Sequence, residues 1–205
     1  MTARNVRRIA IALILLLIFI VAVVVTLGRA REQINRRKCA MNLSAIGQSV
    51  LLYSNDHQHN FPPSLGALAL EENAAPAVFI CPDSGTSAPQ NLAPSQLADW
   101  VNAHSDYIYI AQSIRDKSSF DSKTNQEAFA FDDKDDPGVR WDSAQSKRLV
   151  VAYEKDQNHR GTGMSVLFAD GHVEWMTLDA AHNAIALTQA KIATANKLTP
   201  ASSRP

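Results

Sequence analysis

The side chains in this chain that could bind a metal or take part in catalysis are histidines and aspartates that lie close together in the sequence. They form two groups: Asp56, His57 and His59, and His159, Asp170 and His172. Imidazole and carboxylate groups bind transition metals, but these spacings match no compact ligand motif. A histidine on a strand is more often a solvated side chain than a ligand, so the sequence leaves the metal ligands undefined.

A further acidic group, made of Asp132, Asp133, Asp135 and Asp136, could offer oxygen ligands to Ca²⁺. The run lacks the glycine and the terminal glutamate of an EF-hand loop. We therefore expect a solvated acidic turn and no bound cofactor, with calcium as the alternative.

Covalent catalysis has no recognisable signature in the sequence. No serine or cysteine stands in a nucleophile elbow, and isolated histidines and aspartates do not define a triad. The sequence therefore predicts no catalytic residues and a protein that is not an enzyme.

The most prominent element of the chain is an uninterrupted apolar segment at residues 9–27. Fifteen of its nineteen residues are Ile, Leu, Val or Phe, and together they favour the bilayer by roughly 6 kcal/mol. A core helix is rarely apolar on every face, and a signal peptide has a shorter apolar region before a small-residue cleavage site. The segment predicts an uncleaved transmembrane helix in preference to these two alternatives.

Charge separates this anchor from the rest of the chain. The formal net charge of zero divides into +7 for residues 1–38 and −7 for the remainder. Basic residues flank the span on both sides, so the positive-inside rule alone does not fix its orientation. Nucleic-acid binding is disfavoured, because the larger part of the chain is acidic and lacks a basic stripe.

The helix should continue beyond the membrane as an amphipathic segment. Apolar residues recur there at spacings of three and four: Cys39, Leu43, Ile46, Val50 and Tyr53. Gly47 costs about 1 kcal/mol relative to Ala in a helix, which predicts close packing at that point. The helix should end near Asn60, because Pro62 and Pro63 cannot continue it.

The remaining elements are shorter. Ser64 can cap a short helix through Leu70, and another is predicted at residues 95–101, within the first of two long loops at 82–104 and 116–148. Branched and aromatic residues predict strands at 107–111, at 149–154 and in both arms of a hairpin at 164–176. A helix should follow from Asp179 to about Ala195. The predicted fold class is α+β, with an antiparallel sheet laid on the long helix.

The hairpin allows a prediction of its register. Asp170 and Gly171 are expected to form a two-residue type I′ turn in which Gly171 supplies a positive φ. The resulting pairing places one apolar face against the amphipathic helix: Val166, Phe168, Val173 and Trp175. His172 then lies on the face away from the core.

Several segments between residues 39 and 178 form a recognisable series. They are Cys39-Ala-Met-Asn-Leu-Ser-Ala-Ile-Gly47, Tyr53-Ser-Asn-Asp56, Phe61-Pro-Pro63, Phe79-Ile-Cys-Pro-Asp83, Ser105-Asp-Tyr107, Ala152-Tyr-Glu154, Asn158-His159 and Leu167-Phe-Ala-Asp-Gly-His-Val173. Together they resemble a family of bacterial pseudopilin-like proteins whose C-terminal signature is a histidine followed at fixed spacing by Asp-Gly. The resemblance implies a pilin-like fold and a relation to type II secretion pseudopilins. The signature residues, expected to shape the terminal hairpin, are His159, Asp170, Gly171 and His172.

The chain departs from that family at two points. A prepilin-peptidase signal has a glycine followed by Phe-Thr-Leu-x-Glu at the cytoplasmic edge of the span, whereas the first glycine here is Gly28 and the first acid is Glu32. One extra residue also separates His159 from Asp170. We expect this residue in the loop at 160–163, where glycine makes an insertion inexpensive.

The resemblance also places the two cysteines, Cys39 and Cys81, in a compartment where a disulfide could persist. A bond would close a loop of about 42 residues and stabilise the protein by roughly 4 kcal/mol in the chain-entropy model. The alternative is two unlinked buried thiols that behave as small hydrophobes. The sequence leaves both alternatives open.

The predicted organisation has five parts: a cytoplasmic N-terminus at 1–8, a transmembrane helix at 9–27, its amphipathic continuation at 28–60, a pilin-like α+β domain at 61–197 and a disordered tail at 198–205. The expected role is a non-catalytic structural or assembly subunit of a type II secretion or type IV pilus-like system. The resemblance implies a single-pass protein of the bacterial inner membrane with an extracytoplasmic domain, and other pseudopilins or secretion-system proteins as partners. The alternative is an anchored extracytoplasmic metal-binding domain or hydrolase.

Overall fold

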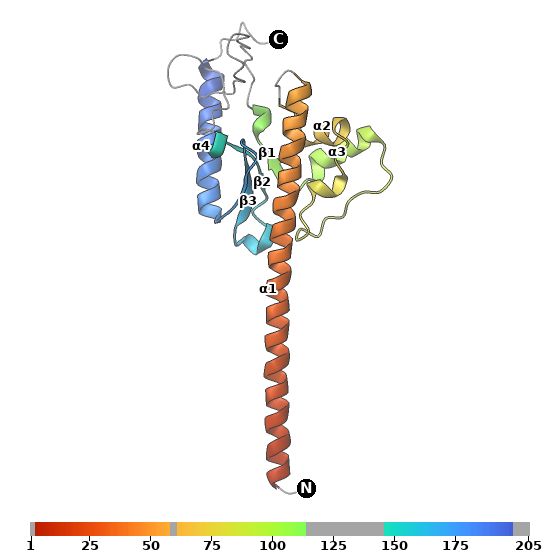
Figure 1. The fold of residues 1–205 in the computed structure, drawn as a ribbon, viewed down its shortest axis with the longest axis vertical. Helices are drawn as coiled ribbons and strands as arrows, with labels where there is room; N and C mark the ends of the chain where they lie inside the picture. Colours follow the sequence, from red (N-terminus) through yellow and green to blue (C-terminus); the bar gives the residue numbers. More distant parts are fainter. Residues whose placement is uncertain (1–2, 58–60, 114–145, 199–205) are drawn as a thin grey trace.

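The computed structural model describes residues 3–57, 61–113 and 146–198, and it shows an α+β protein built on one very long helix (Figure 1). This helix, α1, runs from Ala3 to Asp56 over 54 residues, which corresponds to about 80 Å at 1.5 Å per residue. It ends four residues before the predicted boundary at Asn60. His59, the acidic run at 132–136 and the predicted tail beyond residue 198 lie outside the described residues.

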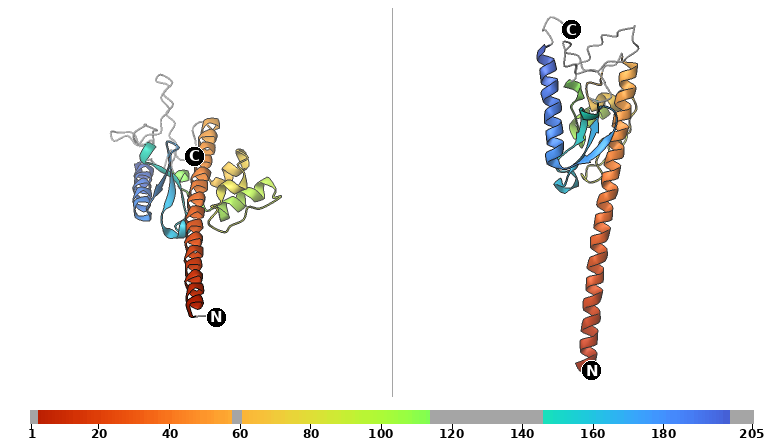
Figure 2. Two further views of the ribbon diagram at one scale, coloured as in Figure 1. Left: turned by 60° about the horizontal axis from the view of Figure 1, so that its bottom comes forward. Right: turned by 60° about the vertical axis from the view of Figure 1, so that its left-hand side comes forward.

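The N-terminal part of α1 projects from the rest of the protein (Figures 1 and 2). Every side chain from Ile11 to Leu27 is exposed in the isolated chain. By length and composition this part of α1 is able to cross a membrane. The helix predicted at residues 9–27 is therefore present, and it is apolar on all sides.

The C-terminal part of α1 lies inside the domain. The predicted apolar stripe is confirmed, because all of its members are buried: Cys39, Leu43, Ile46, Val50 and Tyr53. Gly47 lies against Leu167, whose Cδ1 would be only 2.9 Å from a Cβ at this position. The close packing predicted at Gly47 is thus also confirmed.

Two short helices cover one side of α1 (Figure 1). Helix α2 spans Leu65–Glu71 and α3 spans Pro94–His104, with the 3-10 turn η1 at Pro76–Phe79 between them. The Ser64 hydroxyl caps α2 by accepting a hydrogen bond from the Ala67 amide at 3.2 Å, as predicted. Helix α3 is longer than the predicted 95–101 segment and occupies much of the region expected to be a loop.

A four-stranded antiparallel sheet packs on the other side of α1, in the order β1-β2-β3-β4. Its strands are β1 Tyr107–Tyr109, β2 Val150–Glu154, β3 Met164–Phe168 and β4 Val173–Met176. Helix α4, Leu178–Leu198, covers the sheet face opposite to α1 (Figures 1 and 2). Short 3-10 turns complete the described elements: η2 Ala111–Ser113, η3 Ser146–Arg148 and η4 Asn158–Gly161. The predicted sheet and C-terminal helix are therefore both present.

The turn of the β3–β4 hairpin differs from the predicted type. The Gly171 amide donates to the Phe168 carbonyl at 2.9 Å, and the Phe168 amide donates to the His172 carbonyl at 3.0 Å. Gly171 has φ 85°, whereas Asp170 is not among the residues with positive φ. These features describe a three-residue loop, a type I turn closed by a glycine bulge, so the predicted two-residue type I′ turn is wrong.

The change of turn shifts the register by one residue, and this reverses the faces of β3. Leu167 pairs with Val173, and both pack in the core on the α1 side. Val166 and Phe168 instead pack with residues of α4 on the opposite face. The prediction that these two residues face α1 is therefore wrong, because a shift of one residue moves a strand's side chains to the other face.

Candidate functional site

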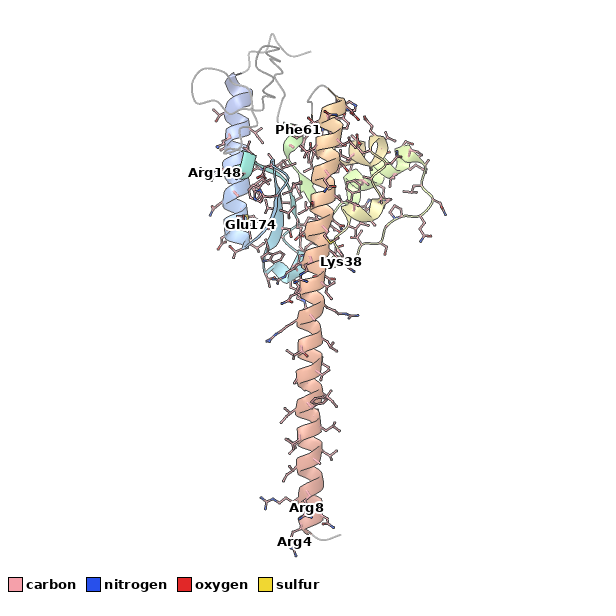
Figure 3. All side chains as sticks on the ribbon, in the orientation of Figure 1. Arg4, Arg8, Lys38, Phe61, Arg148 and Glu174 are labelled. Carbon is pink, nitrogen blue, oxygen red and sulfur yellow. The ribbon has the colours of Figure 1, made fainter. Side chains whose placement is uncertain are left out.

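Five polar side chains converge where α1 enters the domain, and we call them the junction cluster: Glu32, Cys39, Cys81, Glu154 and His159. They come from α1, from the segment after η1, from the end of β2 and from η4. The side chains other than Glu32 are fully buried. Figure 3 labels Lys38, the residue before Cys39, at the lower edge of the domain, while Arg4 and Arg8 lie at the far end of α1. The cluster thus lies at the boundary between the anchor and the domain.

Helix geometry places the two α1 members on one face. Glu32 and Cys39 are seven residues apart, which corresponds to two helical turns. Cys81 is fixed from another direction, because its amide donates to Asp106 Oδ2 at 3.0 Å. The amide of Asp106 in turn donates to the Phe79 carbonyl at 2.9 Å. The backbone around Cys81 is therefore held against the start of the sheet.

His159 reaches the cluster through an unusual backbone conformation. His159 and Arg160 have φ values of 53° and 57°, and Gly161 continues with 67°. The left-handed region costs a non-glycine residue about 1 kcal/mol or more. Thr162 closes this turn by donating its hydroxyl to the His159 carbonyl at 2.8 Å. Strain of this kind persists where surrounding contacts fix it, and it often marks a functional position.

Both ring nitrogens of His159 face other members of the junction cluster. Nε2 lies 3.6 Å from Cys81 Sγ and 3.4 Å from Glu154 Oε2. Nδ1 lies 3.1 Å from Glu32 Oε1. The edge of the ring packs against Trp175, with centroids 5.2 Å apart. The imidazole is therefore enclosed, with two acids and a thiol around it.

Glu154 is a buried carboxylate that is only partly satisfied. Its Oε2 accepts a hydrogen bond from the Ser165 amide at 3.1 Å. Among the described residues no hydrogen-bond partner exists for Glu154 Oε1 or for the Ser165 hydroxyl. Burying a polar oxygen without a partner is costly, so Glu154 Oε1 indicates an interaction that the described side chains do not supply.

Cys39 and Cys81 are free and buried, so the structure shows the alternative of two unlinked thiols and not the disulfide. Their sulfur atoms and a His159 nitrogen all lie within 4.8 Å of one another. The hydrogen bond with Cys39 and the neighbouring His159 outweigh burial and lower the pKa of Cys81 to about 6. The same thiol–thiol hydrogen bond, with burial, raises the pKa of Cys39.

The charge state of His159 follows from the same contacts. Burial lowers its pKa, but hydrogen bonds with Cys81 and Glu154 outweigh burial and raise the pKa to about 10. At neutral pH this arrangement favours a Cys81 thiolate beside a His159 imidazolium, with Cys39 as a thiol. The junction cluster therefore holds acidic groups whose protons a cation could replace.

Arg36 makes three polar contacts beside the cluster, on the side toward the membrane span. Arg36 Nε donates to Glu32 Oε1 at 2.8 Å, and its guanidinium lies 4.2 Å from the centre of the Trp175 ring. The same guanidinium donates to the Thr162 hydroxyl at 2.9 Å. Arg36 thus holds Glu32, the η4 turn and β4 together beneath the cluster.

The structure separates the residues of the predicted His-Asp-Gly motif. His159 lies before β3, and the pair Asp170 and His172 lies at the other end of that strand. The His172 ring contacts the Asp170 carboxylate and stacks on Phe168, with centroids 4.4 Å apart. Hydrogen bonds from His172 outweigh partial burial and lower the pKa of Asp170. Asp170, Gly171 and His172 therefore form the turn, while His159 belongs to the junction cluster.

Of the other predicted histidine group, Asp56 ends α1 and His57 follows it. His57 Nε2 is 2.9 Å from Glu71 Oε2, and its ring stacks on Tyr53 with centroids 3.8 Å apart. These contacts connect α1 with α2. The two histidine groups that stand out in the sequence therefore belong to different parts of the fold.

The acids of the junction cluster were missed as site residues by the sequence analysis. Glu32 is the only acid among the first 38 residues, and Glu154 stands in a strand whose other residues are mostly apolar. An isolated acid in a basic segment and an acid at the end of an apolar strand are both visible in the sequence. Neither indicates which histidine or cysteine lies beside the carboxylate, because the members are far apart along the chain.

Comparison with known protein families, with curated proteins and with solved structures finds no match to this chain. The candidate site is therefore interpreted from its own geometry. Two thiols, an imidazole and a carboxylate that meet in a buried space can bind a soft or borderline metal ion, or the thiols can undergo redox chemistry.

Proposed function

We propose that this chain is a membrane-anchored, pilin-like subunit with a structural, non-catalytic role in a type II secretion or type IV pilus-like assembly. The observation that supports this proposal most strongly is the division of α1. One part of the helix is apolar and exposed on all sides, and the other forms the centre of the domain. A long helix that serves as both anchor and core is the architecture that the pilin-like resemblance implies.

The exposed part of α1 needs a partner that is not water. Its large apolar side chains are 38 to 66% exposed between Ile11 and Leu27. A contiguous apolar surface of this size on a single chain is typical of a membrane or protein contact. Its composition favours bilayer insertion by roughly 6 kcal/mol, so lipid is the first partner that we assign.

The charged residues on both sides of the span fit the same location. Arg4 and Arg8 precede the span, and Arg29, Arg31 and Lys38 follow it. Such side chains bind lipid headgroups at both surfaces of the bilayer. The pilin-like resemblance supplies the orientation that we propose, with the N-terminus in the cytoplasm and the domain outside the inner membrane.

Assembly would use the same helix. Within lipid, helices associate through side-chain packing, because lipid tails and apolar side chains offer equal hydrophobic environments. Among the described residues the side chains from Ile11 to Leu27 are all exposed, so the circumference of the span is open to neighbouring helices. The proposed partners are further copies of this chain or other pseudopilins.

A photo-crosslinking residue at Phe19 tests this proposal in native membranes. Phe19 is 66% exposed, so it faces lipid or a neighbouring helix. We expect crosslinks between the spans of copies of this chain, or to another pilin-like helix, identified by mass spectrometry. The same probe at Leu187, which is also 66% exposed on α4, measures random encounters. Crosslinks no more frequent at Phe19 than at Leu187 would contradict the assembly role.

The intact mass of the protein from its own membranes adds a second test. A shortened and N-methylated chain would show that a prepilin-type peptidase accepts this sequence and would support a filament subunit. An unprocessed chain without span-to-span crosslinks would contradict assembly and favour a monomeric anchor.

A further inference from the structure

We propose that the junction cluster is a binding site for one divalent transition metal ion, with zinc as the ion that its donor set suits best. The ligands are Cys39 Sγ, Cys81 Sγ, His159 Nε2 and one carboxylate oxygen of Glu154. This site is independent of the proposed assembly role, since its geometry lies within a single chain.

The distances around His159 match a tetrahedral site. Zinc bonds of about 2.3 Å to sulfur and about 2.0 Å to nitrogen or oxygen place neighbouring sulfur and nitrogen ligands about 3.5 Å apart, and nitrogen and oxygen about 3.3 Å apart. His159 Nε2 lies 3.6 Å from Cys81 Sγ and 3.4 Å from Glu154 Oε2. Two distances from Nε2 therefore match a tetrahedron, and the two sulfurs and a ring nitrogen lie within 4.8 Å of one another. The Glu154 carboxylate lies outside this group of three, so it would have to move toward the sulfurs to complete the tetrahedron.

A bound metal ion would explain why a carboxylate is buried in the cluster without a full set of hydrogen-bond partners. Glu154 is fully buried, and its Oε1 has no hydrogen-bond partner among the described residues. Beside it lie two thiols and an imidazole, all buried. A divalent cation would compensate the buried negative charge and give the carboxylate a ligand bond. The mixture of sulfur and nitrogen donors selects zinc over magnesium or calcium.

A supporting carboxylate is also in position. Zinc-bound histidines usually donate their second ring N–H to a carboxylate, which fixes the ring and the tautomer. Here Nδ1 of His159 lies 3.1 Å from Glu32 Oε1, and Arg36 Nε donates to the same oxygen at 2.8 Å. Glu32 therefore orients His159 so that Nε2 is directed at the metal.

The site is of the structural kind. Four protein ligands fill a tetrahedral coordination shell and leave no open position for a substrate. Binding releases to solvent the proton of the Cys39 thiol and the Nε2 proton of His159, and neither sulfur changes its oxidation state. The ion would connect α1 with the segment after η1, with β2 and with η4. It would thus fix the domain to its anchor just beyond the basic residues of the membrane boundary.

The experiment uses the full-length chain, purified in detergent under reducing conditions. We expect about one zinc ion per chain by elemental analysis. Replacing zinc with Co²⁺ should produce thiolate-to-cobalt charge-transfer absorption together with the visible bands of a tetrahedral site. Neither signal depends on any variant, so they remain informative if a substitution prevents folding.

Matched variants identify the ligands. Cys81→Ser and His159→Asn should each weaken zinc binding by more than tenfold. His182→Asn, an exposed histidine that contacts Asp156, should leave it unchanged. Glu154→Gln should also weaken zinc binding, whereas Glu174→Gln, at an exposed position, should leave it unchanged. Glu32→Gln should weaken binding by about 10- to 100-fold, the range typical of a carboxylate that supports a histidine ligand.

Three results would overturn the proposal. The reduced chain could fail to bind zinc and give no thiolate band with Co²⁺. Zinc could stay bound equally well in Cys81→Ser and His159→Asn. Finally, protein extracted from its own membranes could contain no metal and show thiols only after reduction, which would establish a Cys39–Cys81 disulfide in place of the metal.

Discussion

The two parts of α1 differ in what stabilises them, although they belong to one uninterrupted helix. Residues 9–27 are apolar around the whole circumference, and every side chain from Ile11 to Leu27 is exposed in the isolated chain. Beyond Cys39 one apolar stripe is buried by the sheet and the α2–α3 pair, and the remaining faces are mixed and exposed. The first pattern suits a helix surrounded by lipid, and the second suits a helix that is surrounded by protein on two sides.

This difference indicates that attachment and folding are separable properties of the chain. Substitutions in the span should change membrane partitioning and leave the domain folded. Substitutions in the domain should change the free energy of unfolding and leave the chain attached. The junction cluster lies where the membrane-spanning part of α1 joins the part inside the domain.

The largest effect is expected from charge in the span. Each arginine near its centre costs about 3 kcal/mol, and each lost apolar side chain removes about another 0.5 kcal/mol, so Leu16→Arg with Phe19→Arg offsets the roughly 6 kcal/mol that favours insertion. The double variant should leave the membrane fraction on alkaline extraction. Met41→Arg with Leu51→Arg, on exposed positions of the other part of α1, should stay attached. Equal behaviour of the two variants would contradict the distinction between the two parts.

A cavity in the buried stripe should produce the next largest effect. Leu43 is fully buried in the core around α1, and Leu43→Ala should lower the free energy of unfolding by about 3 kcal/mol. Leu52→Ala, on the exposed face of the same helix segment, should change it by less than about 1 kcal/mol. Denaturant unfolding in detergent measures both variants. A similar loss for both would show that the stripe does not carry the packing.

The hairpin provides a substitution that affects folding alone. Gly171 has φ 85° and open space around it, so Gly171→Val should cost more than about 1 kcal/mol through backbone strain without any clash. Gly171→Asn should cost less, because asparagine tolerates a positive φ. Membrane attachment should be the same for both. An unchanged melting midpoint for Gly171→Val would contradict the glycine-bulge turn.

Arg36 should produce the smallest effect, although it lies at the boundary. It pairs with Glu32 and lies over the Trp175 ring, but its side chain is 33% exposed. Partly exposed ion pairs and cation–π contacts each contribute about 0.5 to 1 kcal/mol, so Arg36→Ala should lower the melting midpoint only slightly. Arg37→Ala, an exposed neighbour, is the control. A loss above about 3 kcal/mol would mean that the junction and not the stripe dominates stability.

Periodicity predicted α1 well because the buried face of a helix is visible in the spacing of residues that are close together in the sequence. Each residue of the stripe from Cys39 to Tyr53 follows from spacing alone, and the packing at Gly47 follows from the cost of glycine in a helix. The hairpin register was wrong because Asp-Gly fits both a two-residue turn and a three-residue turn with a glycine bulge. One residue of difference there decides which face Val166 occupies.

The junction cluster could not be assembled from the sequence for a different reason. His159 was grouped with Asp170 because the two are close along the chain, but a strand of five residues places them at opposite ends. Its neighbours in space are Glu32 and Cys81, which lie far from it in sequence. Only the three-dimensional fold brings such residues together.

Hydrogen–deuterium exchange of the full-length chain in lipid nanodiscs, in denaturant that unfolds the domain, tests the division of α1 most directly. Amides at 9–27 should stay protected because lipid stabilises that helix independently, while amides from Cys39 to Asp56 should exchange with the rest of the domain. Loss of protection in both parts at the same denaturant concentration, or free exchange at 9–27 before denaturant is added, would contradict the account.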